Sequence, residues 1–228
     1  MAELRLRAQY TKLGDLRFTS HLDLTRVIER AVRRAQLPIA YSEGFHPKPK
    51  IAYGPALALG ITSRVELADF QLARPTEAAV FQQKLNAVLP QGCQITKVAP
   101  VPENEPALTT LIDRAAYRIT VDPEVVPSAS TLSKAVQDIL EQETVIVQRE
   151  KKGRRRRVDI RPYLIDLVVS QTGEGKVQVD ALLQIGSAGA TNPKEVLGLF
   201  GLELAQPGVA VERTGLYTCA NNHLVELI

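Results

Sequence analysis

The chain has 228 residues, of which 45 % are hydrophobic and 23 % charged, as is typical of a globular protein with one large or two small domains. It contains no run of about eighteen apolar residues and no signal-peptide block at its N-terminus, so we expect a cytoplasmic protein without a membrane partner. The net charge is only +3, yet residues 1–60 carry ten lysines and arginines against five acids. This local excess favours a phosphate-bearing partner.

The first half of the chain alternates between strand and helix patterns. Strict alternation of apolar and polar residues predicts strands, and apolar residues at helical spacing predict helices. In chain order we expect a strand at 4–10, a turn at 12–15, a helix at about 20–36, strands at 51–59 and 65–72, a helix that begins at 75–77, and a strand at 94–98. This β-α-β-β-α-β order is that of a ferredoxin-like unit.

The helix at 20–36 is amphipathic, with one strongly basic face. Ser20 is a typical N-cap residue, and Asp23 adds a carboxylate in the first turn. The apolar stripe consists of Val27, Ile28, Ala31, Val32 and Ala35. Arg26, Arg30, Arg33 and Arg34 share the opposite side, which we call the arginine face. This face is a candidate RNA-binding surface, although basic helix faces are often simply solvated.

The segment 42–50, called the basic loop here, follows that helix. Pro47, Pro49 and Gly44 restrict its backbone, and we expect Gly44 to have a positive φ. The loop presents Phe45, His46, Lys48 and Lys50. An aromatic ring beside cations suits RNA, whose bases stack and whose phosphates attract positive charge. Alternatively, Phe45 is a core residue that attaches the loop to the helix.

The second half repeats the order of elements after a proline-rich stretch at 100–106, which we interpret as a linker. We expect a strand at 116–121, a helix capped by Ser128 or Ser130, strands at 144–148 and 158–170, a strand at 176–185, a helix capped by Asn192-Pro193, and a strand at 209–217. The prediction is therefore an α+β fold with two tandem ferredoxin-like (βαββαβ) units and antiparallel sheets. The units occupy residues 1–102 and 107–228, and the second has an extra hairpin strand. Such a pair resembles the CRISPR RNA-processing endonucleases in architecture, which favours RNA as a ligand.

The densest positive charge lies at 151–157, between two apolar strands. Arg154, Arg155, Arg156 and Arg157 end this run, and we expect them at a hairpin tip that binds RNA phosphates. A solvated tip without a ligand is the alternative. In a strand at 158–170, Asp159, Arg161 and Tyr163 would share one face, either as a structural ion pair or as a binding row, and we favour binding for Arg161.

Several of these segments resemble the radical-SAM-linked (radical-SAM-associated) domain family, whose function is uncharacterised. The similar segments are SHLD, RAVRRA, YSEGFHPKPKI and PALALG at 20–60, VDIRPYL at 158–164, and ERTGLY at 212–217. Members of the family are companions or C-terminal extensions of cobalamin-binding radical SAM proteins. The resemblance therefore implies a radical SAM protein as partner.

The chain lacks the residues of a radical SAM catalyst. Cys93 and Cys219 are its two cysteines and lie in unrelated segments, so it cannot hold an iron–sulfur cluster by itself, and we expect buried thiols rather than a disulfide. The three histidines, His21, His46 and His223, form no metal-binding spacing. No nucleotide-binding glycine motif is present, and the glycine-bearing loop before Pro193 is interpreted as an ordinary helix cap. We expect no cofactor and no metal.

Three functions are compatible with these features. We favour a non-catalytic RNA-binding or substrate-presenting module that acts with a radical SAM partner in RNA modification or processing. The second is a metal-independent RNA-cleaving enzyme, with His46 and Lys48, or His21 and Tyr41, as base and phosphate stabiliser. The third is a protein-docking adaptor that binds no nucleic acid.

Overall fold

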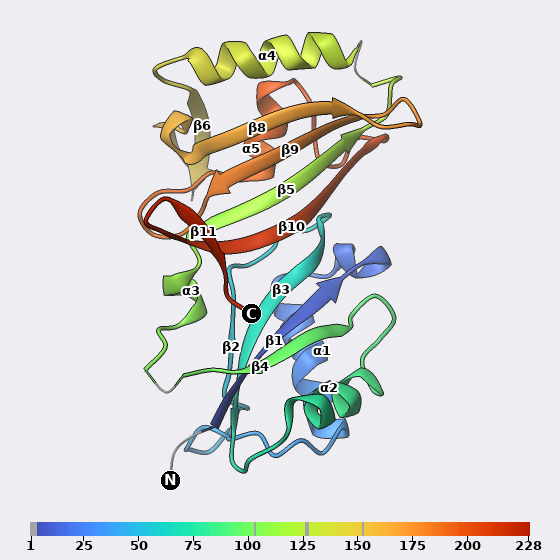
Figure 1. The fold of residues 1–228 in the computed structure, drawn as a ribbon. Coiled ribbons are helices and arrows are strands. Elements are labelled where there is room, and N and C mark those ends of the chain that lie inside the picture. The colour runs from blue at the N-terminus through green and yellow to red at the C-terminus, as the bar shows by residue number, and fades with distance from the viewer. Residues whose placement is uncertain (1–3, 103, 126–127, 152) are drawn as a thin grey trace. The chain divides into compact units, whose positions relative to one another are not determined.

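The computed structural model describes residues 4–102, 104–125, 128–151 and 153–228. These residues form an α+β fold with five α-helices and a large, mostly antiparallel sheet of nine strands (Figure 1). The chain divides into two compact units, one of residues 1–112 with 216–228 and the other of residues 113–215. The predicted linker at 100–106 belongs to the first unit, where the Arg5 guanidinium donates to the carbonyl oxygens of Pro102 and Glu105.

In the first unit, four strands pair antiparallel in the order β4-β1-β3-β2, and the end of β10 (Val209–Ala220) with β11 (His223–Glu226) belongs to the same unit. The four strands are β1 (Leu4–Lys12), β2 (Ile51–Tyr53), β3 (Thr62–Leu72) and β4 (Ile95–Pro100). Its α-helices are α1 (His21–Arg34), α2 (Ala78–Asn86) and the short α3 (Leu108–Leu111), and a 3-10 helix covers Gly14–Phe18. The strand predicted at 51–59 is thus shorter, and α3 and the 3-10 helix have no counterpart in the prediction.

Helices α1 and α2 cover one face of this sheet. Ile28, Ala31 and Val32 of α1 are buried, which confirms the inner part of the predicted apolar stripe. Phe81 of α2 meets Phe70 of β3 with ring centroids 5.0 Å apart. Because the apolar side of α1 is used in this core, its arginine face points to solvent.

The second unit has α4 (Ala129–Glu141) and α5 (Pro193–Leu199) beside the antiparallel strands β5 (Arg114–Val121), β9 (Val177–Gln184) and β8 (Leu164–Gln171), adjacent in that order. Burial alternates along β9, with Val177, Val179, Ala181 and Leu183 inside. This period-two pattern is the one that predicted the strand.

Strand β10 (Val209–Ala220) contributes its first part to the second unit and its last part to the first. The end of β10 forms a hairpin with β11 (His223–Glu226) inside the first unit. Asn221 and Asn222, both with positive φ, make the two-residue turn. The sequence predicted the strand of β10 but not its continuation into this hairpin.

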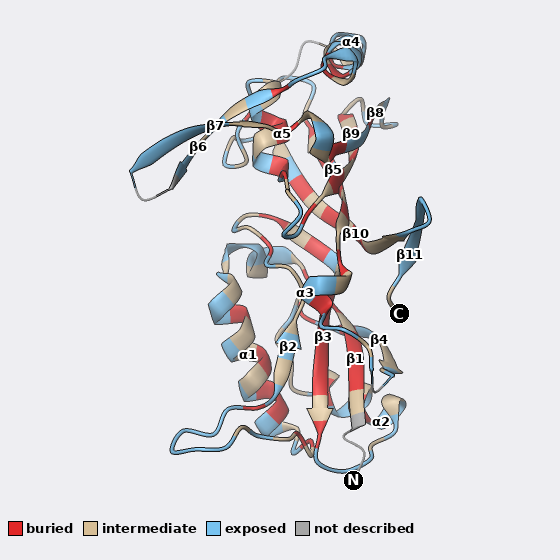
Figure 2. Ribbon diagram, turned by 90° about the vertical axis from the view of Figure 1, so that its left-hand side faces the viewer, coloured by how far each residue is buried: buried red, intermediate tan, exposed pale blue. Residues whose placement is uncertain are grey.

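Strands β6 (Ile146–Lys151) and β7 (Arg154–Asp159) form a separate two-stranded sheet, called the arginine ribbon here. In Figure 2 it extends away from the rest of the second unit. The continuous strand predicted at 158–170 is wrong, because a 3-10 turn at Arg161–Tyr163 separates β7 from β8. Pro162 in this turn has no amide hydrogen for a ladder, which explains the break. The sequence predicted one extra hairpin strand in the second unit, and the structure has this two-stranded ribbon instead.

Candidate nucleic-acid interface

All four side chains of the arginine face are at least partly exposed, as the sequence pattern predicted. Ser20 caps α1, since its hydroxyl accepts a hydrogen bond from the Asp23 amide at 3.1 Å. Arg26 lies 3.4 Å from the Asp23 carboxylate, and Arg34 donates to the Val88 carbonyl oxygen at 2.6 Å. Arg33 and Arg34 occupy the last turn, where positive charge also favours the helix dipole. Part of this face therefore has a structural explanation that needs no ligand.

The basic loop has a hydrogen-bonded base. The amide of Ser42 donates to the Lys48 carbonyl oxygen at 2.9 Å, and the Lys48 amide donates to the Ser42 hydroxyl at 3.0 Å. Below this pair, Ala40 and Lys50 bond to each other and to Gln71 of β3 at 2.8–3.0 Å. The loop is therefore an ordered extension from the end of the sheet, and Figure 2 shows it projecting from the first unit.

The tip of the basic loop is open to solvent. Gly44 has a φ of +112°, as predicted, and Phe45 has a relative exposure of 102 %. The alternative that Phe45 is a core residue is therefore wrong, because its ring contacts no core. His46, Lys48 and Lys50 are also exposed. An aromatic ring held in water by an ordered loop gains from stacking on a flat apolar surface such as a base.

The arginine ribbon carries four consecutive exposed arginines, Arg154 to Arg157. They lie in strand β7 rather than at the hairpin tip that the sequence predicted, since Arg154 already pairs with Lys151 of β6; Lys152 lies outside the described residues. The register pairs Glu150 with Arg155, Arg149 with Arg156 and Gln148 with Arg157. Since successive side chains alternate, Arg154 and Arg156 lie on one face and Arg155 and Arg157 on the other. Arg155 is 3.2 Å from Glu150.

The middle of strand β6 is attached to α5 by a forked ion pair. Arg149 meets both carboxylate oxygens of Glu195, with N–O distances of 2.6 and 2.8 Å, and also donates to the Ala190 carbonyl. The Thr191 hydroxyl donates to the same carboxylate at 2.8 Å. The hydrogen bond that Arg149 donates to Glu195 raises the pKa of Arg149. This contact fixes the direction of the ribbon, and sequence reasoning missed it because the two residues lie far apart in the chain.

Arg161 is used inside the second unit. Its guanidinium donates to the Leu140 carbonyl oxygen at 2.7 and 3.1 Å, at the end of α4, and to the Leu164 carbonyl oxygen at 3.2 Å. Asp159 accepts from the Arg161 amide at 3.0 Å, so the pair is linked through the backbone rather than through an ion pair. These bonds give Arg161 a structural role, and its predicted RNA contact stays a prediction.

The two histidines that the sequence offered for RNA cleavage lie in different surroundings. His21 packs edge-on against Tyr53 with ring centroids 5.9 Å apart, whereas His46 is exposed. Neither cysteine forms a disulfide, and Cys93 is buried as expected, whereas Cys219 is only partly buried. Burial raises the pKa of Cys93 to about 12, so this thiol is protonated at neutral pH. Within the described part of the chain, no cluster of three or more His, Cys, Asp or Glu side chains is suited to a metal ion.

The glycine-bearing loop before α5 ends in an ordinary cap. The Asn192 side chain accepts hydrogen bonds from the amides of Lys194 and Glu195 at 3.0 and 3.2 Å. These amides are the donors that an anion would need, so Asn192 occupies the position of a phosphate.

Among the helices in the described ranges, none has the length and apolar character needed to cross a membrane.

A known family of proteins matches most of the chain. The chain belongs to the family described as "Uncharacterized protein conserved in bacteria (DUF2344)", whose model matches residues 5–193. The matched region includes the arginine face, the basic loop and the arginine ribbon. No curated protein matches the chain.

Proposed function

We propose that this protein is a non-catalytic RNA-binding module. The observation that carries the proposal is the arginine ribbon, in which Arg154, Arg155, Arg156 and Arg157 stand exposed outside the main sheet. Four adjacent guanidinium groups repel one another, and a polyanion relieves that repulsion. The ion pair of Arg149 with Glu195 supports the proposal, since it holds the ribbon in a fixed direction without using the exposed arginines.

The basic loop favours single-stranded RNA within this proposal. Phe45 offers an exposed ring for stacking at the tip of the loop, and Lys48 and Lys50, exposed nearer its base, would contact phosphates. The arginine face adds further positive charge to the same unit. We further predict that the basic loop, the arginine face and the arginine ribbon contact one RNA at the same time. The contact of Arg161 with RNA is also a prediction.

We extend the proposal to the fold of the two units. We interpret each unit as ferredoxin-like, which is supported by the antiparallel order β4-β1-β3-β2 with two helices on one face in the first. In the second unit, β5, β9 and β8 with α4 and α5 follow the equivalent order, and the ribbon is an insertion between α4 and β8. Such sheets serve as RNA-binding platforms in other proteins.

The proposed partner is a radical SAM protein in the cytoplasm, and the proposal rests on the sequence resemblance. The chain would present RNA to that partner for modification or processing. Co-expression with a cobalamin-binding radical SAM protein from the same bacterium tests this step. Co-elution of both proteins after nuclease treatment supports it, and separate elution contradicts it.

RNA binding itself is tested by fluorescence anisotropy with a labelled twelve-nucleotide single-stranded RNA of mixed sequence, over a series of salt concentrations. We expect the logarithm of affinity to fall linearly with the logarithm of salt, with a slope of roughly 0.7 for each phosphate contacted. Absence of binding at low salt would favour the protein-docking alternative. Shortening of the RNA during the assay would favour the RNA-cleaving alternative.

A further inference from the structure

Strand β8 is an unpaired edge of the second unit. Among the described strands it pairs only with β9, so its other side is available for hydrogen bonding. A free edge can accept an additional strand, and proteins often protect such edges with lysine, proline or a bulge. β8 has a bulge at its start, near Ile165, but no lysine or proline, and Asp166 is its single charged residue. The part from Leu167 to Gln171 is therefore a regular edge.

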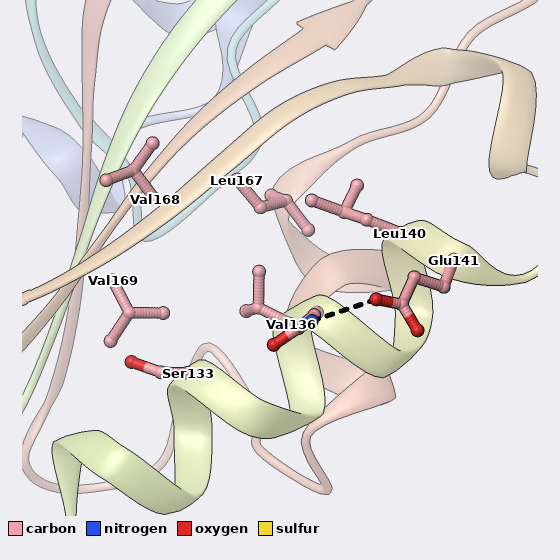
Figure 3. Close-up of a pocket in the computed structure, with 8 residues that line it drawn as sticks. Ser133, Val136, Leu140, Glu141, Leu167, Val168 and Val169 are labelled. Atoms are coloured by element: carbon pink, nitrogen blue, oxygen red, sulfur yellow. Dashed lines mark hydrogen bonds between the residues drawn. The ribbon is translucent and has the colours of Figure 1, made fainter.

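A shallow groove of about 370 Å³ lies between this edge and α4. Figure 3 shows Val136 and Leu140 of the helix facing Leu167 and Val169 of the strand, with Ser133 and Glu141 on the helix side. The groove is predominantly apolar, and three consecutive residues of the strand line it, namely Leu167, Val168 and Val169. Val168 borders it with 51 % of its surface exposed. An extended chain along β8 would place alternate side chains into this groove.

The exposed charge at the C-terminal end of α4 is negative, while Lys134 adds one positive charge in the middle of the helix. Asp138, Glu141 and Glu143 are exposed at the end of α4, and the Gln137 amide holds the Glu141 carboxylate at 2.9 Å. The last turn of α4 has no basic residue, although negative charge near a helix C-terminus is unfavourable. The Arg161 guanidinium binds backbone carbonyls at this end and leaves the three carboxylates exposed. A cation from a partner would offset them.

We propose that this groove binds an extended segment of a protein partner in which apolar residues alternate with lysine or arginine. The segment adds to the edge of β8 through its backbone and inserts an apolar side chain between α4 and β8. Its apolar side chains face α4, and the positive charge of the segment as a whole complements the acidic end of that helix. This surface is independent of the proposed RNA interface, and the ligand differs in class.

The probe is an acetylated octapeptide of alternating valine and lysine, compared with the same peptide carrying glutamate for lysine. Binding to the full chain is followed by amide chemical shifts in ¹H–¹⁵N spectra. The lysine peptide is expected to shift the amides of residues 166–171 and to bind at least about fivefold more tightly than the glutamate peptide.

Two pairs of variants separate the groove from general charge attraction. Glu141→Lys should weaken the lysine peptide by about two- to fivefold, while Glu174→Lys, at the distant β8–β9 turn and 81 % exposed in its side chain, should leave affinity unchanged. Ser133→Trp fills the groove and should weaken binding by about tenfold or more. Thr131→Trp, at an exposed position of the same helix that does not line the groove, serves as its control.

Equal binding of the two peptides, or shifts confined to other segments, would overturn the proposal. So would an equal loss of affinity from Glu141→Lys and Glu174→Lys. Shifts at 166–171 that depend on protein concentration, together with a dimer in light scattering, would identify a second copy of the chain as the occupant and would also overturn it.

Discussion

The basic loop of the first unit and the arginine ribbon of the second expose positive charge in two different ways. The loop keeps its shape through a few hydrogen bonds at its base and a glycine with positive φ, and it carries an aromatic ring. The ribbon keeps its shape through a regular ladder and the Arg149–Glu195 pair, and no aromatic residue occurs in it. The loop is thus suited to one unstacked base, and the ribbon to the backbone of a polyanion.

This difference implies a division of labour that affinity measurements can separate. Contacts to phosphate depend steeply on salt, whereas base stacking is much less sensitive to it. Changes in the ribbon should therefore alter the salt dependence of binding, and changes at Phe45 should alter affinity at every salt concentration. We expect the ribbon to have the largest effect and the single lysines of the loop the smallest.

Replacing Arg154, Arg155, Arg156 and Arg157 together by alanine should lower RNA affinity on the order of a hundredfold at low salt and flatten the salt slope by roughly 0.7 for each phosphate that is no longer bound. The melting temperature should barely change, because exposed charges contribute little to folding. Anisotropy titrations and thermal unfolding measure both effects. The variant with four lysines keeps the charge and should keep most of the slope. An unchanged slope in the alanine variant would exclude the ribbon from the interface.

Phe45→Ala should lose about 1–3 kcal/mol of RNA-binding free energy, the usual contribution of a stacked base. Stability should not change, since the ring is fully exposed. The matched control is Phe18→Ala, another exposed aromatic of the first unit, whose ring lies 4.7 Å from the Arg17 guanidinium. If both variants lose the same affinity, or neither loses any, Phe45 does not stack a base.

Gly44→Val should weaken RNA binding by an amount similar to Phe45→Ala. A β-branched residue is strained at a φ of +112°, so the loop tip would change its conformation and move Phe45. No atom lies within 4 Å of the added Cβ, which means that the effect comes from the backbone. Gly173→Val, in an open turn without positive φ, is the control. Wild-type affinity in Gly44→Val would mean that the loop conformation is irrelevant to binding.

Lys48→Ala and Lys50→Ala should produce the smallest losses, about two- to fivefold each, because each removes one exposed charge. The losses should disappear as salt rises, in contrast to the loss in Phe45→Ala. Titrations at low and high salt distinguish the two behaviours. A loss that persists at high salt would assign these lysines a direct contact to bases instead.

The regular elements could be predicted because their periodicity is strong. The stripe of Ile28, Ala31 and Val32 and the alternation along β9 follow directly from burial on one face. The boundaries that failed depend on local chemistry, as at Pro162, where a strand pattern is interrupted by a residue that cannot join a ladder. The identity of the arginine ribbon as a separate sheet had no periodic signal, since four identical charged residues fit a strand and a loop equally well.

The site residues show the same limit. Sequence indicated that Gly44 needs a positive φ, but it could not decide whether Phe45 was buried or exposed, since both are compatible with a loop between glycine and proline. Arg149 of β6 and Glu195 of α5 are 46 residues apart in the chain, so no local pattern joins them. The sequence favoured RNA binding for Arg161, whereas in the structure its guanidinium donates hydrogen bonds to the Leu140 carbonyl oxygen at the end of α4.

The path of β10 has a consequence for biosynthesis. Residues 113–215 form the second unit, so this unit is completely synthesised while the first still lacks its last segment. That segment includes Leu227, whose carbonyl oxygen accepts a hydrogen bond from Arg7 at the other end of the chain. At about 5–20 residues per second, the ribosome needs roughly 5–20 s to traverse the intervening unit. The nascent first unit therefore cannot complete its structure until residues 216–228 are synthesised, whereas the second unit can fold before that.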